Sequence, residues 1–243
     1  ESSRLNKFMK IGTINIDWFK KSLDKKKHIL EEIKAQDFDF LIVTENLEEF
    51  EISEKYSAYH SNKIPLDRTF QYLDYQKYLN GKQAIRTSIY SKIPSIKKNK
   101  TSDGFTSVCH TFKINDKEIT IYGTIIGTWG IKYQKEIAKK ELLDFISDID
   151  NLAKENVFLI LAGDFNTSFD SNEMRQLVQI NSREVLKSVT EEYGFERTTE
   201  NIKDNIDHIF FSKSIKSLEP YVWFSDIDLK DGCHKGIGVN FEF

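Results

Sequence analysis

The sequence has few cysteines, few prolines and no excess of basic charge. Its 243 residues include 2 Cys and 3 Pro, and the formal net charge is −3 at pH 7. Two cysteines, Cys109 and Cys233, do not make the dense disulfide framework of a small secreted protein, so we expect a reducing compartment and a cytoplasmic location. A net negative charge argues against a strongly basic nucleic-acid binder, although a local basic groove is compatible with it.

The sequence also lacks a hydrophobic run long enough to cross a membrane, and no signal peptide is visible. It starts at Glu1 rather than Met, so residues 1–8 are interpreted as a cloning remnant or a trimmed leader. An export signal removed earlier is therefore compatible with the sequence. Residues 9–243 contain neither an internal repeat nor a low-complexity linker, and a chain of this length can bury a substantial core. We expect one domain and a monomer.

Segments with strand and helix periodicity alternate along the chain. Apolar spacing predicts helices over residues 18–35, 132–152, 172–180 and 183–192, and strands over 10–16, 38–45, 84–90, 106–114, 118–126, 157–162, 206–211, 221–224 and 236–243. Residues 46–81 are long for a loop and are expected to hold short helices or an insertion that faces the substrate. The alternation indicates an α/β fold, and the hairpin turn predicted at 115–117 excludes a purely parallel sheet.

One apolar run, residues 157–162, is followed directly by Gly163-Asp164-Phe165-Asn166. The run is typical of a buried strand, and Gly163 lets the backbone leave it sharply. Asp164 and Asn166 then lie at the tip of a strand, where a carboxylate and an amide can activate water and hold a phosphoryl oxygen. The alternative is that they cap the next helix, because Asp and Asn are preferred at helix N-termini and in turns.

Three other predicted strands carry a polar residue near one end, namely Asn15, Glu45 and Asp207. Together with Gly163–Asn166 and with His234 near the C-terminus, these segments resemble, in order, the endonuclease/exonuclease/phosphatase superfamily. This is the deoxyribonuclease I-like group of metal-dependent phosphoesterases. The resemblance spans nearly the whole chain. It implies a four-layer sandwich, in which two mixed β-sheets pack face to face between outer helices, with a catalytic cleft at one end.

The resemblance implies a bound Mg²⁺ or Mn²⁺ ion and assigns residues to it. Glu45 is the expected first metal ligand, since Mg²⁺ prefers hard oxygen ligands and needs only one or two carboxylates. Asn15 would hold a metal-bound water or a phosphate oxygen. Asp164 would orient and deprotonate the attacking water, and Asn166 would steady the phosphoryl group.

The resemblance also pairs Asp207 with His234. Asp207 would orient the imidazole and keep it protonated, because a nearby opposite charge favours the charged form. The imidazolium would then neutralise charge on the transition state. The neighbouring His208 alternates to the opposite face of its strand and is interpreted as structural.

The C-terminal motif departs from the family pattern. Members usually show Ser-Asp-His before the last strand, whereas Cys233 directly precedes His234 in this sequence. Asp231 either supplies the carboxylate for the metal through a longer turn or is an ordinary loop acid. Cys233 as a nucleophile would require an activating environment.

The central strand departs as well, since many members carry a histidine after a threonine there. Here Thr124 has no histidine near it in sequence. Tyr122, Thr124, Thr128 or His110 on the partner strand of the hairpin could substitute.

We name Thr124 and Trp129 as substrate-binding residues. Trp129 stands near Lys132 and Lys135 in the sequence, and such a group can stack a base and meet phosphate. The alternative is an exposed helix start with one packing aromatic.

The sequence therefore predicts a divalent-metal-dependent phosphoester hydrolase, with a nuclease or other phosphodiesterase as the leading interpretation. The expected partner is a phosphoester substrate, in that case a nucleic acid. Two alternatives stay open because of the acidic charge and the two departures. One is a phosphatase acting on a nucleotide, a sugar phosphate or a lipid headgroup, and the other is a catalytically degenerate binding module of the same fold.

Overall fold

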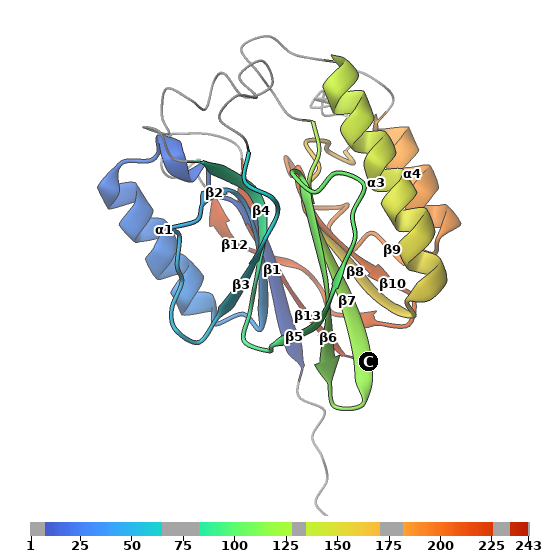
Figure 1. The fold of residues 1–243 in the computed structure, drawn as a ribbon, viewed down its shortest axis with the longest axis horizontal. Coiled ribbons are helices and arrows are strands. Elements are labelled where there is room, and N and C mark those ends of the chain that lie inside the picture. The colour runs from blue at the N-terminus through green and yellow to red at the C-terminus, as the bar shows by residue number, and fades with distance from the viewer. Residues whose placement is uncertain (1–7, 65–82, 128–134, 171–181, 226–233, 243) are drawn as a thin grey trace, which may run out of the picture.

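A computed structural model describes residues 8–64, 83–127, 135–170, 182–225 and 234–242. Two mixed β-sheets lie face to face, and helices cover their outer sides (Figure 1). This arrangement confirms the four-layer α/β sandwich. None of the described helices combines the length and apolar character that a membrane crossing requires.

The first sheet contains seven strands within the described residues, in the order β11-β13-β1-β2-β4-β3, with β12 also paired to β13. These are β1 (Met9–Asn15), β2 (Phe40–Leu47), β3 (Ser57–His60), β4 (Ala84–Ser91), β11 (Lys216–Ser217), β12 (Tyr221–Ser225) and β13 (Lys235–Glu242). Strands β1 and β2 are parallel, and Asn15 pairs with Thr44. The polar ends of these two strands therefore meet at the same edge of the sheet.

The second sheet contains six strands in the described part of the chain, in the order β5-β6-β7-β8-β10-β9. These are β5 (Ser95–Asn99), β6 (Ser107–Ile114), β7 (Lys117–Ile125), β8 (Phe158–Asp164), β9 (Phe195–Glu196) and β10 (Asp207–Ser212). Strands β7 and β8 are parallel, whereas β8 and β10 are antiparallel. Asp164, at the end of β8, consequently pairs with Asp207 at the start of β10.

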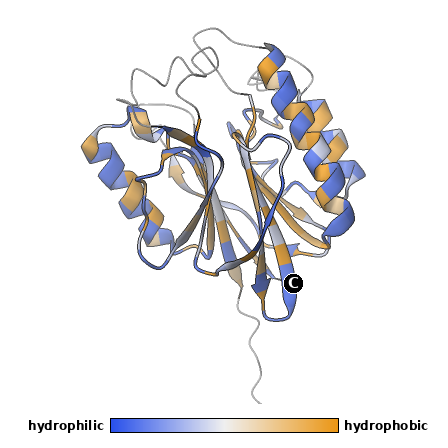
Figure 2. Ribbon diagram, viewed as in Figure 1, coloured by the Kyte–Doolittle hydropathy of each residue, from blue (hydrophilic) through white to orange (hydrophobic). Residues whose placement is uncertain are grey.

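The core lies between the sheets and continues under the helices. Ile42, Ile121 and Ile160 belong to the fully buried layer between the sheets, and the next residues along two of these strands, Tyr122 and Leu161, pack on the helix side. Hydrophobic residues run along the strands of both sheets, whereas each helix mixes hydrophobic and hydrophilic residues (Figure 2). The middle of the second sheet is thus buried on both faces, which explains the near-continuous apolar runs of β8 and β10.

The helices are close to their predicted positions: η1 (Trp18–Lys20), α1 (Leu23–Gln36), α3 (Lys135–Glu155) and α4 (Ser182–Glu192). The helix expected from residue 18 starts only at Leu23, because Trp18–Lys20 form a separate 3₁₀ turn. The side chain of Ser22 accepts a hydrogen bond from the Lys25 amide and so caps α1. The helix predicted over 172–180 lies outside the described residues.

Four short strands, β3, β5, β9 and β11, were absent from the sequence prediction. Strand β3 falls in the segment interpreted as irregular, and β5 has the polar sequence SIKKN. All four lie at or beside an edge of a sheet. A strand with a neighbour on one side only needs little apolar surface, so hydrophobic periodicity does not reveal it.

Candidate active site

Five predicted site residues meet at one edge of the sandwich. Asn15 ends β1, Glu45 lies in β2, Asp164 ends β8, Asp207 begins β10 and His234 directly precedes β13. The first four are buried, and the His234 side chain is 18% exposed. Both sheets contribute, so the site exists only when the two sheets are packed together.

The turn after β8 places Asp164 by backbone geometry. Gly163 has a φ of 144°, and a Cβ atom at this position would lie 1.9 Å from the carbonyl oxygen of Thr124. Only glycine fits there. Asn166 has a left-handed φ of 48°, and its backbone amide donates a hydrogen bond to Asp164 Oδ1 at 2.9 Å. The Asn166 side chain donates to the carbonyl of Ile126 at 2.7 Å and so ties this turn to the segment after β7.

Asp164 is buried and has polar neighbours on other strands. Asn15 Nδ2 donates to Asp164 Oδ2 at 2.9 Å, across the two sheets. Burial raises the pKa of Asp164 to about 7; His234 and the Asn15 hydrogen bond act against this rise, whereas Asp207 and Glu45 add to it. A carboxyl group that titrates near neutral pH is suited to accept a proton from water.

Asp207 and His234 form a contact of 3.1 Å between Oδ2 and Nδ1. Asp207 is completely buried, and its second oxygen, Oδ1, has no hydrogen-bond partner in the described part of the chain. Ligand atoms of Asp164, Asp207 and His234 all lie within 4.8 Å of one another. A buried carboxylate oxygen without a donor requires a water molecule, a proton or a cation.

Asp17 also belongs to this edge, although the sequence analysis did not select it. Burial raises the pKa of Asp17, the Glu45 carboxylate raises it further, and Lys20, whose Nζ lies 3.1 Å from Asp17 Oδ1, lowers it. Its amide donates to Asn15 Oδ1 at 3.0 Å. Asp17 and Glu45 both adopt left-handed backbone, with φ of 41° and 56°. The available sequence signal was the alternation Asn15-Ile16-Asp17 at a strand end.

These residues fit a divalent cation. Carboxylates of Asp17 and Glu45 lie close enough to raise the pKa of Asp17, and Asp164 experiences the same effect from Asp207 and Glu45. A cation between such groups would relieve their repulsion, and oxygen ligands favour Mg²⁺ or Mn²⁺.

The remaining predicted residues have different surroundings. Thr124 is buried, and its Oγ1 lies 2.8 Å from Ser107 Oγ. The hydroxyl of Tyr122, also buried, is 2.9 Å from Asp148 Oδ2 on α3. Trp129 and Asp231 lie outside the described residues, as do Thr128 and Cys233.

The other two histidines named above, His110 and His208, have surroundings unlike those of His234. His110 pairs with Ile121 in the middle of its strand, and its Nδ1 lies 2.8 Å from Ser95 Oγ. Its ring packs on Tyr59 in a tilted arrangement, and burial lowers its pKa to about 4. The structure therefore does not bring His110 to the edge where the five predicted site residues meet. His208 is fully buried, and its Nε2 lies 2.9 Å from the Thr167 carbonyl, as a structural residue would.

The sequence matches the model of the Endonuclease/Exonuclease/phosphatase family over residues 12–226. The chain therefore belongs to this family, as the order of its motifs indicated. A search of curated proteins finds no match.

Solved structures of this superfamily align with nearly the whole chain. The 3'-5' exonuclease NExo from Neisseria meningitidis has 13% identity and a TM-score of 0.66, and the alignment covers 97% of this chain and 100% of that chain. A family protein from Leptotrichia buccalis has 15% identity and a TM-score of 0.63, with 97% and 100% covered. The endonuclease domain of the retrotransposon TRAS1 has 14% identity and a TM-score of 0.63, with 97% and 99% covered. At these identities the likeness shows the shared fold.

Proposed function

We propose that this protein is a divalent-metal-dependent phosphoester hydrolase and that its substrate is a phosphodiester in nucleic acid. The observation that carries the proposal is Asp164, a fully buried carboxyl group with a pKa of about 7, held between Asn15 and the Asp207–His234 pair. A structural carboxylate has no need of such a position, since its burial is costly.

Asp164 would act as the general base. Its Oδ1 accepts the Asn166 amide and its Oδ2 accepts the Asn15 side chain, so both oxygens have fixed directions. Each oxygen has a further lone pair that can accept the proton of an attacking water. A base with a pKa near the working pH combines a large ionised fraction with a useful affinity for the proton.

His234 would stabilise the charge that develops on the phosphoryl oxygens. Its Nδ1 faces the buried Asp207 carboxylate at 3.1 Å, which favours an imidazolium. Nε2 is then the ring nitrogen that would donate to a phosphoryl oxygen. Glu45, with Asp17 beside it, would hold Mg²⁺ or Mn²⁺, and the bound ion supplies Lewis-acid stabilisation of the phosphoryl group.

The nuclease interpretation is supported by the superfamily neighbours. NExo is a 3'-5' exonuclease, and the aligned domain of TRAS1 is an endonuclease. A second structure of NExo is described as a 3' phosphatase bound to a product DNA hairpin. Hydrolysis of a phosphoester at a nucleic-acid end is thus compatible with the same arrangement.

A panel of substrates tests the proposal. Plasmid DNA, single-stranded DNA, RNA, bis-p-nitrophenyl phosphate, p-nitrophenyl phosphate and a phospholipid would be incubated with Mg²⁺ or Mn²⁺, and with EDTA. We expect metal-dependent turnover of diesters, strongest on nucleic acid. Preference for p-nitrophenyl phosphate or the phospholipid would favour the phosphatase interpretation over the nuclease interpretation. Absence of turnover together with absence of metal binding would instead indicate a degenerate binding module.

A further inference from the structure

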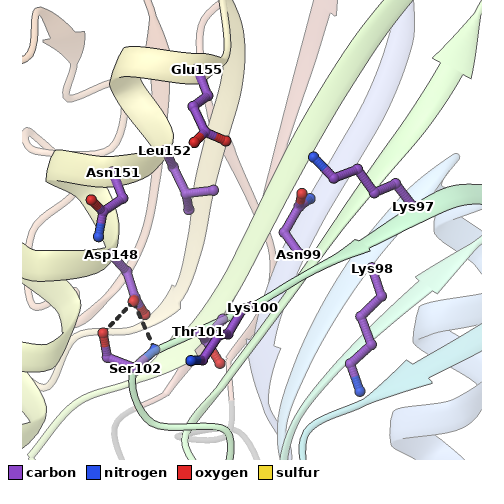
Figure 3. A pocket seen from close by; sticks show the side chains of 10 residues that line it. All are labelled: Lys97, Lys98, Asn99, Lys100, Thr101, Ser102, Asp148, Asn151, Leu152 and Glu155. Carbon is purple, nitrogen blue, oxygen red and sulfur yellow. Dashed lines mark hydrogen bonds between the residues drawn. The ribbon is translucent and has the colours of Figure 1, made fainter.

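Edge strand β5 and the residue after it carry three lysines beside a cavity that is separate from the carboxylates of the candidate active site. The cavity has a volume of about 560 Å³ and lies between residues 97–102 and the C-terminal half of α3. Lys97 and Asn99 stand on the strand side, and Asn151 and Glu155 stand on the helix side (Figure 3). Cavities of roughly 300–1,000 Å³ are of the size that holds a nucleotide-sized ligand.

The three lysines, Lys97, Lys98 and Lys100, are exposed, and none forms an ion pair with any residue that the structure describes. Three uncompensated charges within four residues are unusual for a chain of net charge −3. Lysines on an edge strand can also serve to prevent pairing with another sheet. That role requires neither a cavity nor a particular direction of the side chains.

A second cavity of about 160 Å³ lies on the other side of the same segment. Both cavities are lined by residues 98–101, and the second also by His60, Asn62 and Ser107. The Ser107 hydroxyl lies 2.8 Å from that of Thr124, and Thr124 pairs with Gly163, the residue before Asp164. The basic segment 97–101, which we call the ridge, borders both cavities, and strands β6, β7 and β8 follow β5 in the sheet that ends at Asp164.

The two acids in the large cavity are not equivalent. Asp148 is buried, and its oxygens accept hydrogen bonds from the Ser102 amide and hydroxyl and from Tyr122. It therefore fixes the ridge to α3 and is not turned to a ligand. Glu155 is exposed and leaves one negative charge facing the lysines.

We propose that the ridge 97–101 and its two cavities bind the backbone of a single-stranded nucleic acid whose scissile phosphate lies at Asp164. This inference rests on the proposed function and names its substrate more closely. The lysines neutralise successive phosphates, and the cavities receive the bases on either side of the ridge. A single strand can bend from one cavity to the other, whereas a rigid duplex is too wide to enter either.

The test measures binding of a fluorescent oligothymidylate by anisotropy, in an Asp164→Asn background so that the strand is not cut. The variant K97Q/K98Q/K100Q is compared with K25Q/K26Q/K27Q, which removes the same charge from α1. We expect the ridge variant to bind roughly tenfold more weakly, and the slope of log K against log salt to shrink by about 2, which is three contacts at about 0.7 each. The α1 variant should match the parent protein.

Glu155→Gln gives an independent result of opposite sign, because removal of the facing acid should tighten binding of the single strand. Equal binding and equal salt slopes for the ridge and α1 variants would overturn the proposal. Lysine-dependent binding of duplex but not of single strands would overturn it too. With wild-type Asp164 restored, the ridge variant should raise KM on long single strands and leave turnover of bis-p-nitrophenyl phosphate unchanged.

The two proposals fail in different ways. Lysine-dependent strand binding without any hydrolysis would contradict the proposed hydrolase activity and would leave the proposed binding of single strands by the ridge standing. Metal-dependent hydrolysis of single strands that is unchanged in the ridge variant would contradict binding by the ridge and would leave the proposed hydrolase activity standing.

Discussion

At the scale of single residues, the site depends on carboxyl groups that folding removes from water. Asp164 is 1% exposed, and the Asn15 side chain is a hydrogen-bond donor to it from the other sheet. In the absence of a cation, the neutral acid is the form favoured by this environment. Burial therefore prepares Asp164 to take up a proton and also makes its charged form costly.

The stability of metal-free protein should reveal this cost. The pKa of Asp164 is about 7 in the folded state, above the usual value for the unfolded chain, so folded Asp164 binds more protons between roughly pH 4 and pH 7. Its contribution to stability is present at low pH and is lost as the pH rises through 7. The free energy of unfolding of Asp164→Asn should therefore rise relative to that of wild type by roughly 2–4 kcal/mol over this pH range. Urea unfolding in EDTA measures the difference.

The comparison of Asp164→Asn with wild type removes the contribution of His208, which has the same surroundings in both proteins. His208, whose pKa burial lowers to about 4, makes stability rise with pH in wild type and variant alike. Parallel stability curves for the two proteins would show that Asp164 is ionised without penalty.

Gly163 is the other residue on which the position of Asp164 depends. Gly163→Ala would place a methyl group 1.9 Å from the Thr124 carbonyl oxygen, so β7 and β8 would have to separate. We expect a loss of more than about 2 kcal/mol in the free energy of unfolding and a loss of metal binding. Gly194→Ala is the matched control, because its φ is also positive, at 69°, but its neighbour is the flexible Lys213 side chain. Equal losses for the two variants would exclude the steric explanation.

At the scale of elements, helix α3 is bonded to the second sheet through a buried polar network. Tyr122 on β7 donates to Asp148 on α3, and Ser102 bonds to the other oxygen of the same carboxylate. Tyr122→Phe removes the hydroxyl that bonds to both Asp148 and Ser107 and should cost about 1–2 kcal/mol. Asp148→Ala leaves the buried Tyr122 hydroxyl and the Ser102 amide and hydroxyl without this acceptor and should cost more. Denaturant midpoints measure both, and a smaller loss for Asp148→Ala would contradict this arrangement.

The same scale shows what the sequence could predict. Strands β1, β2, β8 and β10 combine an apolar run with a polar end, and both features are local, so the positions of these strands could be predicted from the sequence. The candidate site residues at their ends were assigned by the family resemblance. Edge strands such as β5 lack the apolar run. Asp17 was missed because its place at the site depends on a left-handed turn and on the nearness of Glu45, which only the packed strands establish.

At the scale of the whole molecule, the site joins two sheets. Asn15 and Asp164 are 149 residues apart in sequence and are in hydrogen-bond contact. A cation held at this edge would link the sheets and stabilise the folded state by its binding free energy. Millimolar Mg²⁺ or Mn²⁺ should therefore raise Tm in wild type.

Glu45→Gln should diminish the rise in Tm, because it removes a carboxylate from the site while keeping its size. Glu54→Gln, at an exposed position on the same half of the chain, is the matched control. Calorimetric scans with metal and with EDTA give the shift for each protein. An undiminished shift in Glu45→Gln would place the cation elsewhere.

The most direct measurement is the rate of bis-p-nitrophenyl phosphate hydrolysis in Mn²⁺ by wild type, Asp164→Asn and Asp116→Asn. Asp116 is an exposed aspartate in the β6–β7 turn and provides a matched substitution. We expect wild type and Asp116→Asn to turn over at equal rates, and Asp164→Asn to be slower by roughly 10²–10⁴-fold, the usual effect of losing a general base. Undiminished turnover by Asp164→Asn, or silence of a wild-type protein that binds the metal and this diester, would contradict the role of Asp164 as the base of a phosphoester hydrolase.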